Sequence, residues 1–173
     1  MSEAFFARQD VLARLDAAFW AEHSANGYLL IVGPAGLGKS AILAHWLRRS
    51  TDDGRVLMVA PDIEIGEVAA VVEARIVAAV KAMYPAPVDE GDALMALSGL
   101  ADVLGVVSRR YLASRGARLV IALDGLDGVG EGDLRGLLPV PLPRGVYLLC
   151  ASRPLPTVFE RIAAQILVRI DLD

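Results

Sequence analysis

Eight consecutive residues, at positions 33–40, read Gly-Pro-Ala-Gly-Leu-Gly-Lys-Ser and have the spacing of a phosphate-binding loop. Glycines at this spacing let successive backbone N–H groups converge on one point, and the helix expected to follow adds its positive end. We expect Lys39 to reach the β- and γ-phosphates of a nucleotide and the Ser40 hydroxyl to bind Mg²⁺. The plainer interpretation is a glycine-rich turn with a surface lysine, but a chance match in this composition has a probability of roughly one in a thousand.

The residues that we expect to contact the nucleotide are those of the loop and the one that follows it. They are Gly33, Pro34, Ala35, Gly36, Leu37, Gly38, Lys39, Ser40 and Ala41. Lysine occupies the one position where a compact ammonium on a flexible stem is needed, although nearly all other basic residues are arginine.

Two aspartates follow a second apolar run, 119–123, and stand three residues apart at Asp124 and Asp127. Ligands of open parallel sheets collect at the carboxyl ends of the strands, where both acids and the loop are expected. Asp124 is predicted to bind Mg²⁺ through water, and Asp127 is predicted to act as general base on the attacking water in phosphoryl transfer. Without the loop nearby, either aspartate would be interpreted as a turn or a helix cap.

Arg153 follows another apolar run, 146–151, within the tripeptide Ser-Arg-Pro. A guanidinium at the carboxyl end of a neighbouring strand can sense or neutralise a γ-phosphate. It can equally pair with a surface carboxylate, and the residues by themselves leave both interpretations open.

The elements that must position these side chains follow from the apolar periodicity. Short apolar runs of the kind buried on both faces of a sheet occur at 28–32, 56–60, 119–123, 147–151 and 166–170. Helical stripes lie between them at 68–83 and 94–111, a helix is expected over 40–49, and Asp10 is expected to cap a first helix. The segment 84–91 is expected to link two helices. This alternation predicts an α/β fold with a parallel sheet and helices on both of its faces.

Composition limits the classes of function. The 173 residues correspond to one domain over 1–173, and 55% hydrophobic residues with a mean hydropathy of +0.48 supply a buried core. A net charge of −4 offers no positive field to nucleic acid or to an anionic membrane, so neither is expected as a partner. The longest apolar stretch, 66–83, carries four charged side chains and is not a membrane span.

The remaining titratable and nucleophilic residues suggest no further site. No signal-peptide pattern opens the chain, and its one cysteine cannot form an internal disulfide, so a cytoplasmic location is expected. Cys150 lies in an apolar run and is predicted to be a small core residue. His23 and His45 are far apart in the sequence and have no further ligand at metal-binding spacing.

The segments GPAGLGKS, LVIALDGLD and LLCASRP, in this order, resemble the STAND class of P-loop NTPases, especially its NACHT-like bacterial members. The opening FFARQDVL is similar to the F-x-GRE-x-x-L segment of that class, which lies near the adenine and places Arg8 there. The resemblance implies a three-layer sandwich with five parallel strands in the order 5-1-4-3-2. It also implies binding of ATP or ADP with Mg²⁺, slow hydrolysis used as a switch, self-oligomerisation of the full-length protein, and a sensor role for Arg153.

Three departures from the family pattern shape what we expect of this chain. Ala7-Arg8-Gln9 stands in place of Gly-Arg-Glu, and Gly128 stands in place of a glutamate after the second acid. Family members also continue into a helical and winged-helix region, so we expect a nucleotide-binding core that belongs to a longer protein. The absent carboxylate predicts a weak ATPase. The alternatives are an oligomerisation module that binds nucleotide without hydrolysis or binds none, and a P-loop kinase acting on a small molecule.

Overall fold

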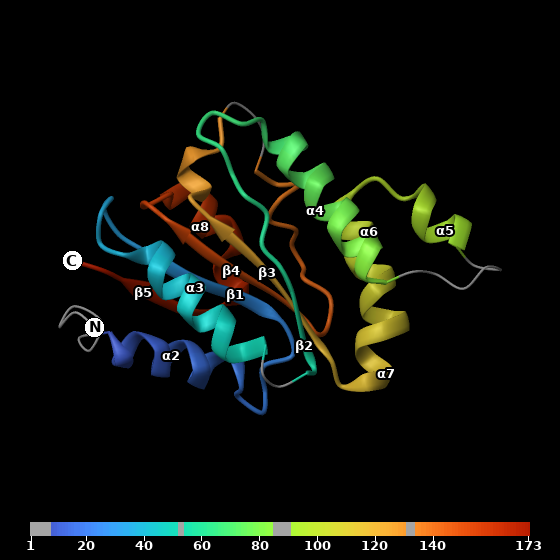
Figure 1. Cartoon of the computed structure of the whole chain (residues 1–173), viewed down its shortest axis with the longest axis horizontal. Coiled ribbons are helices and arrows are strands. Elements are labelled where there is room, and N and C mark those ends of the chain that lie inside the picture. Colours follow the sequence, from blue (N-terminus) through green and yellow to red (C-terminus); the bar gives the residue numbers. More distant parts are fainter. Residues whose placement is uncertain (1–7, 52–53, 85–90, 131–133) are drawn as a thin grey trace.

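A five-stranded parallel sheet forms the centre of the protein, in a computed structural model that describes residues 8–51, 54–84, 91–130 and 134–173 (Figure 1). The strand order is β2-β3-β4-β1-β5, which is the predicted order read from the opposite edge. All strand pairings are parallel. The strands are β1 (Gly27–Val32), β2 (Val56–Val59), β3 (Arg118–Asp124), β4 (Val146–Ser152) and β5 (Ile166–Asp171).

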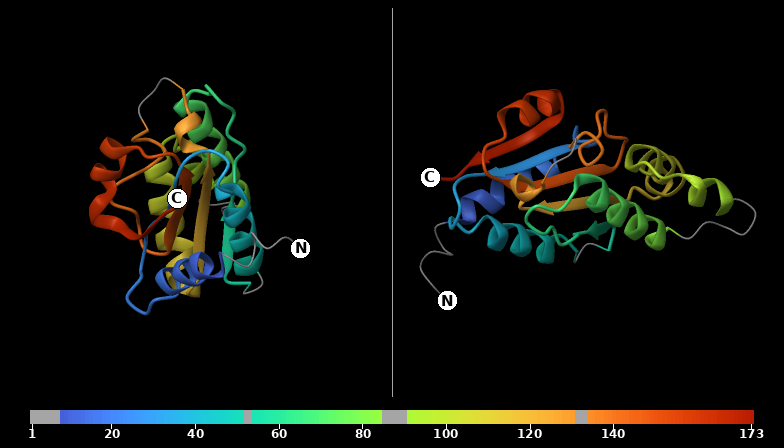
Figure 2. Two further views of the ribbon diagram at one scale, coloured as in Figure 1. Left: turned by 90° about the vertical axis from the view of Figure 1, so that its left-hand side faces the viewer. Right: turned by 90° about the horizontal axis from the view of Figure 1, so that it is seen from above.

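Helices cover both faces of this sheet, and the left view of Figure 2 shows α3 and α8 on opposite sides of the strands. The helices are α2 (Gln9–Phe19), α3 (Lys39–Ser50), α4 (Ala69–Met83), α5 (Gly91–Ala96), α6 (Leu100–Val107), α7 (Ala113–Arg115) and α8 (Pro156–Ile162). A π-helical turn, η2 (Ser108–Leu112), joins α6 to α7, and two 3₁₀ turns are η3 (Leu126–Gly128) and η4 (Ala163–Gln165). The predicted three-layer α/β sandwich is therefore confirmed.

Alternate residues of the central strands feed two separate apolar cores. Leu29, Val120 and Leu149 pack with α2 and α3 on one face. Leu30, Ile121 and Leu148 pack with α4, α6 and α8 on the other. Every residue of β1 and β4 is buried, because these strands have a neighbour on each side and helices above and below.

The edge strands differ from the prediction that all five runs are buried on both faces. In β2 the two central residues are only partly buried, and β5 is buried at Ile170 alone. Each of these strands has one neighbour in the sheet. The remaining edge and part of each face therefore stay in contact with water.

The predicted helix start at Asp10 is wrong. Helix α2 begins at Gln9 with Arg8 at its N-cap, and no side chain makes a capping hydrogen bond there. Asp10 lies inside the first turn, where its negative charge still complements the positive end of the helix.

The predicted continuous helix over 94–111 is interrupted before Leu100. Gly99 adopts an extended backbone (φ −84°, ψ 138°) at the N-cap of α6, and the Leu100 N–H donates to Glu73 Oε1 of α4 at 3.0 Å. A carboxylate from another helix thus satisfies a donor at the start of α6. The predicted linker 84–91 falls almost entirely on residues 85–90, outside the described part of the chain.

Aromatic packing anchors the face covered by α2 and α3. Phe19 makes edge-on contacts with Trp46 and Tyr147, with ring centroids 5.1 and 4.7 Å apart. The guanidinium of Arg118 lies 4.9 Å from the Phe19 ring centroid and donates to the Phe19 carbonyl. Within the described segments no helix has both the length and the apolar character needed to cross a membrane.

We expect Cys150 to resist thiol reagents while the protein is folded. Burial raises the pKa of its thiol to about 12, which at pH 8 lowers the thiolate population about a thousandfold relative to an ordinary cysteine. Absorbance measurements with a disulfide reagent, with and without urea, report this residue alone because the chain has one cysteine. Fast labelling under native conditions would contradict the predicted core position.

Candidate nucleotide-binding site

Three strands deliver the predicted site residues to one edge of the sheet. β3, β4 and β1 are neighbours, and their parallel register pairs Asp124 with Ala151 and Val32 with Ser152. The phosphate-binding loop follows Val32, the two aspartates follow β3, and Arg153 follows β4. The order of the strands therefore brings together residues that are more than 100 positions apart in the sequence.

The loop itself owes its shape to two glycines with positive φ. Gly36 has φ +83° and Gly38 has φ +76°, a conformation that costs other residues about 1–2 kcal/mol. A Cβ at either position would meet no atom within 4 Å, so the backbone conformation, and not close packing, requires glycine there. Helix α3 begins directly after Gly38, and the loop residues 34–36 are exposed. The first N–H groups of α3 and the exposed loop before it suit an anion.

Gly33 is required for a different reason: Leu172, which follows β5, lies close to its backbone. A Cβ at Gly33 would lie 2.8 Å from the carbonyl oxygen of Leu172. The Leu172 N–H donates to the Val32 carbonyl at 2.7 Å, and the Gly33 N–H donates to the Ser152 carbonyl at 3.1 Å. The first residue of the loop is thus held between β4 and the end of β5.

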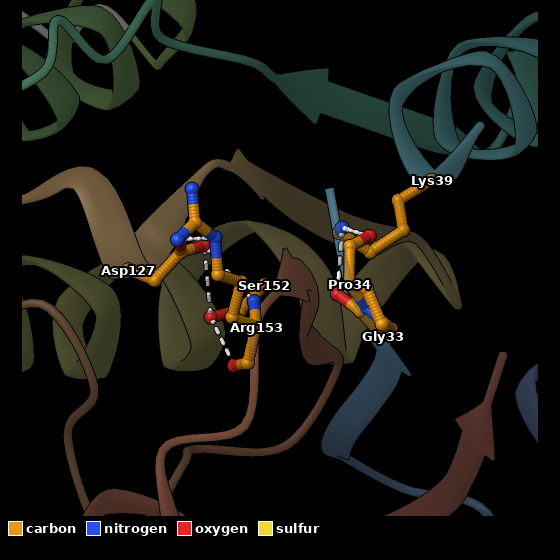
Figure 3. Close-up of polar contacts among 6 residues, drawn as sticks. All are labelled: Gly33, Pro34, Lys39, Asp127, Ser152 and Arg153. Carbon is orange, nitrogen blue, oxygen red and sulfur yellow. Dashed lines mark hydrogen bonds and ion pairs between the residues drawn. The ribbon is translucent and has the colours of Figure 1, made fainter. Parts of the chain in front are cut away.

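Lys39 folds back over the loop that precedes it (Figure 3). Its Nζ donates to the carbonyls of Gly33 at 2.8 Å and Pro34 at 2.7 Å. An ammonium has three protons, so a further donor remains for a phosphate oxygen. Ser40 and Ala41 lie in the first turn of α3 and are exposed, which leaves the Ser40 hydroxyl accessible to a metal ion.

The turn after β3 determines where the two aspartates lie. Asp124 is the last residue of β3, and Gly125, at φ +75°, ends the strand and donates its N–H to the Ala151 carbonyl at 2.9 Å. The 3₁₀ turn η3 follows and contains Asp127. A left-handed glycine at this point turns the chain back, so that Asp127 faces the end of β4 and not bulk solvent.

Asp127 contacts the last residue of β4 and the residue that follows it, as Figure 3 shows. Its Oδ2 lies 3.1 Å from Nε of Arg153, and its Oδ1 accepts the Arg153 backbone N–H at 3.0 Å. The Ser152 hydroxyl lies 3.3 Å from the same Oδ1. Sequence reasoning assigned no role to Ser152, although its place directly before Arg153 at a strand end was a usable signal.

Gly128 has room for a side chain. Its φ is not positive, and a Cβ there would lie 3.6 Å from Cγ1 of Ile65, an ordinary van der Waals distance. The Gly128 carbonyl accepts the Gly66 N–H at 2.7 Å, so the segment before α4 borders the site. Arg75 of α4 steadies this segment by an ion pair with Glu67, and that contact lowers the pKa of the Glu67 carboxyl.

Arg8 lies beside the end of β5. A surface pocket includes Arg8 together with the end of β5, and its other lining residues are Asp10, Val11, Arg14, Ile170, Asp171, Leu172 and Asp173. Leu172 is also the residue that contacts Gly33. Nη1 of Arg8 is buried and has no hydrogen-bond partner among the described residues.

These observations fit a magnesium-bound nucleotide. The loop offers an open cradle of amides with a lysine beside it, and a hydroxyl and a carboxylate follow at Ser40 and Asp124. The described residues contain no cluster of three or more His, Cys, Asp and Glu side chains that could hold a metal ion. Magnesium is commonly bound by one or two protein oxygens together with the nucleotide phosphates, so no such cluster is needed.

Comparison with known families gives a match to the AAA ATPase domain over residues 4–139. The chain belongs to the AAA ATPase domain family. Membership implies nucleotide binding, typically with Mg²⁺, which confirms the prediction in its general form. The narrower resemblance to the STAND class remains a prediction. No curated protein matches this sequence.

Two solved structures of low identity share the fold of this AAA ATPase domain. The ADP form of the Aeropyrum pernix ORC2 protein is 18% identical with a TM-score of 0.57, and the match covers 98% of this chain and 46% of that one. Drosophila ORC bound to DNA is 15% identical with a TM-score of 0.58, and the match covers 96% and 41%. The chain therefore spans less than half the length of either. Since the second structure contains DNA, the comparison does not support our exclusion of nucleic acid as a partner.

Replacing Gly33 by alanine should lower the free energy of unfolding by about 1–3 kcal/mol, because the new methyl group would overlap the Leu172 backbone. Urea denaturation measures this difference. Gly105 in α6 provides the control, since a Cβ there would approach only the flexible end of Arg109 at 3.4 Å. Its replacement by alanine should add up to about 1 kcal/mol of stability. Equal effects at the two glycines would show that the end of β5 does not confine the loop.

Proposed function

We propose that this AAA ATPase domain is the nucleotide-binding core of a molecular switch of the STAND class. It binds Mg·ATP and Mg·ADP through the Gly33–Ser40 loop and hydrolyses ATP slowly. The observation that carries the proposal is the convergence of Lys39, Asp124 and Arg153 on one edge of the sheet. Phosphoryl transfer needs a phosphate cradle, a metal-bound carboxylate and a cation for the γ-phosphate, and these residues supply all three.

Each residue has a defined task in this proposal. Lys39 and the loop amides hold the β- and γ-phosphates, while Ser40 and Asp124 would hold Mg²⁺, which neutralises charge on the phosphates when bound. Arg153 senses the γ-phosphate, and Asp127 accepts a proton from the attacking water. Arg8 lies on the side of the adenine ring of the bound nucleotide. In a longer cytoplasmic protein, the exchange of ATP for ADP would control self-association.

A second candidate is a module that binds nucleotide for assembly and does not hydrolyse it. Gly128 favours this candidate, because the carboxylate that the STAND pattern carries after the second acid is missing. In this candidate the missing carboxylate, and not Asp127, would have been the general base. General-base catalysis contributes about 10²- to 10⁴-fold to a rate, so its loss can leave binding intact while hydrolysis becomes negligible.

Replacing Lys39 by alanine should weaken Mg·ATP binding about 10- to 100-fold, because hydrogen bonds to a charged group contribute roughly 1.5–3 kcal/mol. Calorimetric titration measures the dissociation constant. Lys81, the chain's other lysine, is a matched control, since its Nζ also donates to two backbone carbonyls, those of Met95 and Leu97. Lys81→Ala should keep the wild-type affinity. Unaltered affinity in Lys39→Ala would refute nucleotide binding by the loop.

Replacing Gly128 by glutamate should raise steady-state ATP turnover at least about tenfold, because it restores a carboxylate beside the site. The open space next to Ile65, whose side chain is 95% exposed, accommodates the longer residue. Gly128→Gln has the same shape without the charge and should leave turnover at the wild-type level. Equal turnover in the two variants would show that the missing carboxylate does not limit hydrolysis.

A further inference from the structure

Asp127 and Arg153 form an ion pair in which the two partners are held very differently. The Asp127 side chain is 20% exposed and uses both oxygens, Oδ2 toward Arg153 Nε at 3.1 Å and Oδ1 toward the Arg153 backbone N–H at 3.0 Å. The Arg153 side chain is 64% exposed. The carboxylate is therefore fixed by the turn η3 and by β4, while the guanidinium can leave without disturbing the backbone.

The pair lies directly beside the phosphate-binding loop. Arg153 follows Ser152, whose carbonyl accepts the N–H of Gly33, the first loop residue, at 3.1 Å. Figure 3 shows the Asp127–Arg153 pair and the Lys39 contacts with Gly33 and Pro34 side by side. The Arg153 guanidinium therefore has two alternative acceptors. One is the Asp127 carboxylate, and the other is the γ-phosphate, which ATP carries and ADP lacks.

The strengths of the two interactions determine whether Arg153 binds the Asp127 carboxylate or the γ-phosphate. An exposed ion pair changes an equilibrium by no more than about fivefold. A γ-phosphate offers more negative charge and several acceptor oxygens, and guanidinium binds phosphate by strong paired hydrogen bonds. Arg153 should therefore leave Asp127 for ATP and stay with Asp127 when ADP is bound.

We infer that Asp127 is a positioning residue that holds Arg153 in the absence of a γ-phosphate and so sets the preference of the site between ADP and ATP. This inference rests on the proposed function. ATP binding breaks the ion pair and ADP binding does not, so the pair selectively weakens ATP binding. The same exchange frees Oδ2 of Asp127, which then becomes available to the attacking water.

A double-mutant cycle tests this inference. Dissociation constants of Mg·ADP and of a non-hydrolysable Mg·ATP analogue are measured by calorimetry for the wild type, Asp127→Asn, Arg153→Ala and the double variant. Asparagine keeps an oxygen for the Arg153 N–H and removes the charge. Asp127→Asn should bind the ATP analogue two- to fivefold more tightly and ADP unchanged. In the Arg153→Ala background the same substitution should produce no selective change.

A matched control is the ion pair between Asp16 and Arg49, with 3.3 Å between Asp16 Oδ2 and Arg49 Nη2, which lies on α2 and α3 away from the loop. Asp16→Asn should leave the ratio of the two dissociation constants at the wild-type value. Thermal unfolding of each variant verifies the fold. If Asp127→Asn does not fold, Arg153→Ala at its exposed position still tests a requirement of the inference, because an unchanged affinity for the ATP analogue relative to ADP would overturn it.

The outcomes separate the inference from the proposed function. A gain that is equal for both nucleotides, or that persists in the Arg153→Ala background, would mean that Asp127 acts only through its charge and would overturn the inference. An unchanged ratio in Arg153→Ala would overturn it as well. Wild-type protein that binds neither nucleotide would overturn the proposed function and the inference together.

Discussion

Backbone hydrogen bonds between parallel strands hold this site together. The Gly33 N–H donates to Ser152 at the end of β4, and the Gly125 N–H donates to Ala151 one residue earlier. These two bonds tie the loop after β1 and the turn after β3 to the same strand. Because parallel strands all end at one edge, a register shift in any of them would separate the lysine, the aspartates and the arginine.

The sheet can hold this register because its central strands are buried on both faces. β1 and β4 have no exposed residue, so sliding either strand would expose apolar side chains or break backbone hydrogen bonds in a region without water. The edge strands carry less of this constraint. β5 nevertheless contributes to the site, since the residue after it confines Gly33 and lines the pocket beside Arg8.

Charge is distributed unevenly in this acidic protein. The chain has a net charge of −4, yet Lys39 and Arg153 lie at one edge of the sheet together with the positive end of α3. Asp127 partly neutralises Arg153 there. These groups suit a small anion that carries phosphate.

Local signals in the sequence were sufficient for the loop, the α/β class and the positions of all five strands. A phosphate-binding loop needs glycine at particular positions for backbone reasons, and the structure confirms that Gly36 and Gly38 adopt positive φ. Cys150 could be assigned to the core because it lies in an apolar run typical of a strand that is buried on both faces. The strand order came from resemblance to a family and not from periodicity, since apolar runs do not state which strands are neighbours.

Contacts between distant segments were decided by the tertiary structure alone. At the break before Leu100 the free N–H is satisfied by Glu73 of another helix, and α2 starts at Gln9, one residue before Asp10. The pairing of Asp127 with Arg153, 26 positions apart, required β3 and β4 to be neighbours in register. Sequence determines which groups a residue can offer, because that is local chemistry. Which group it meets is a property of the assembled sheet, where energies from many remote contacts add together.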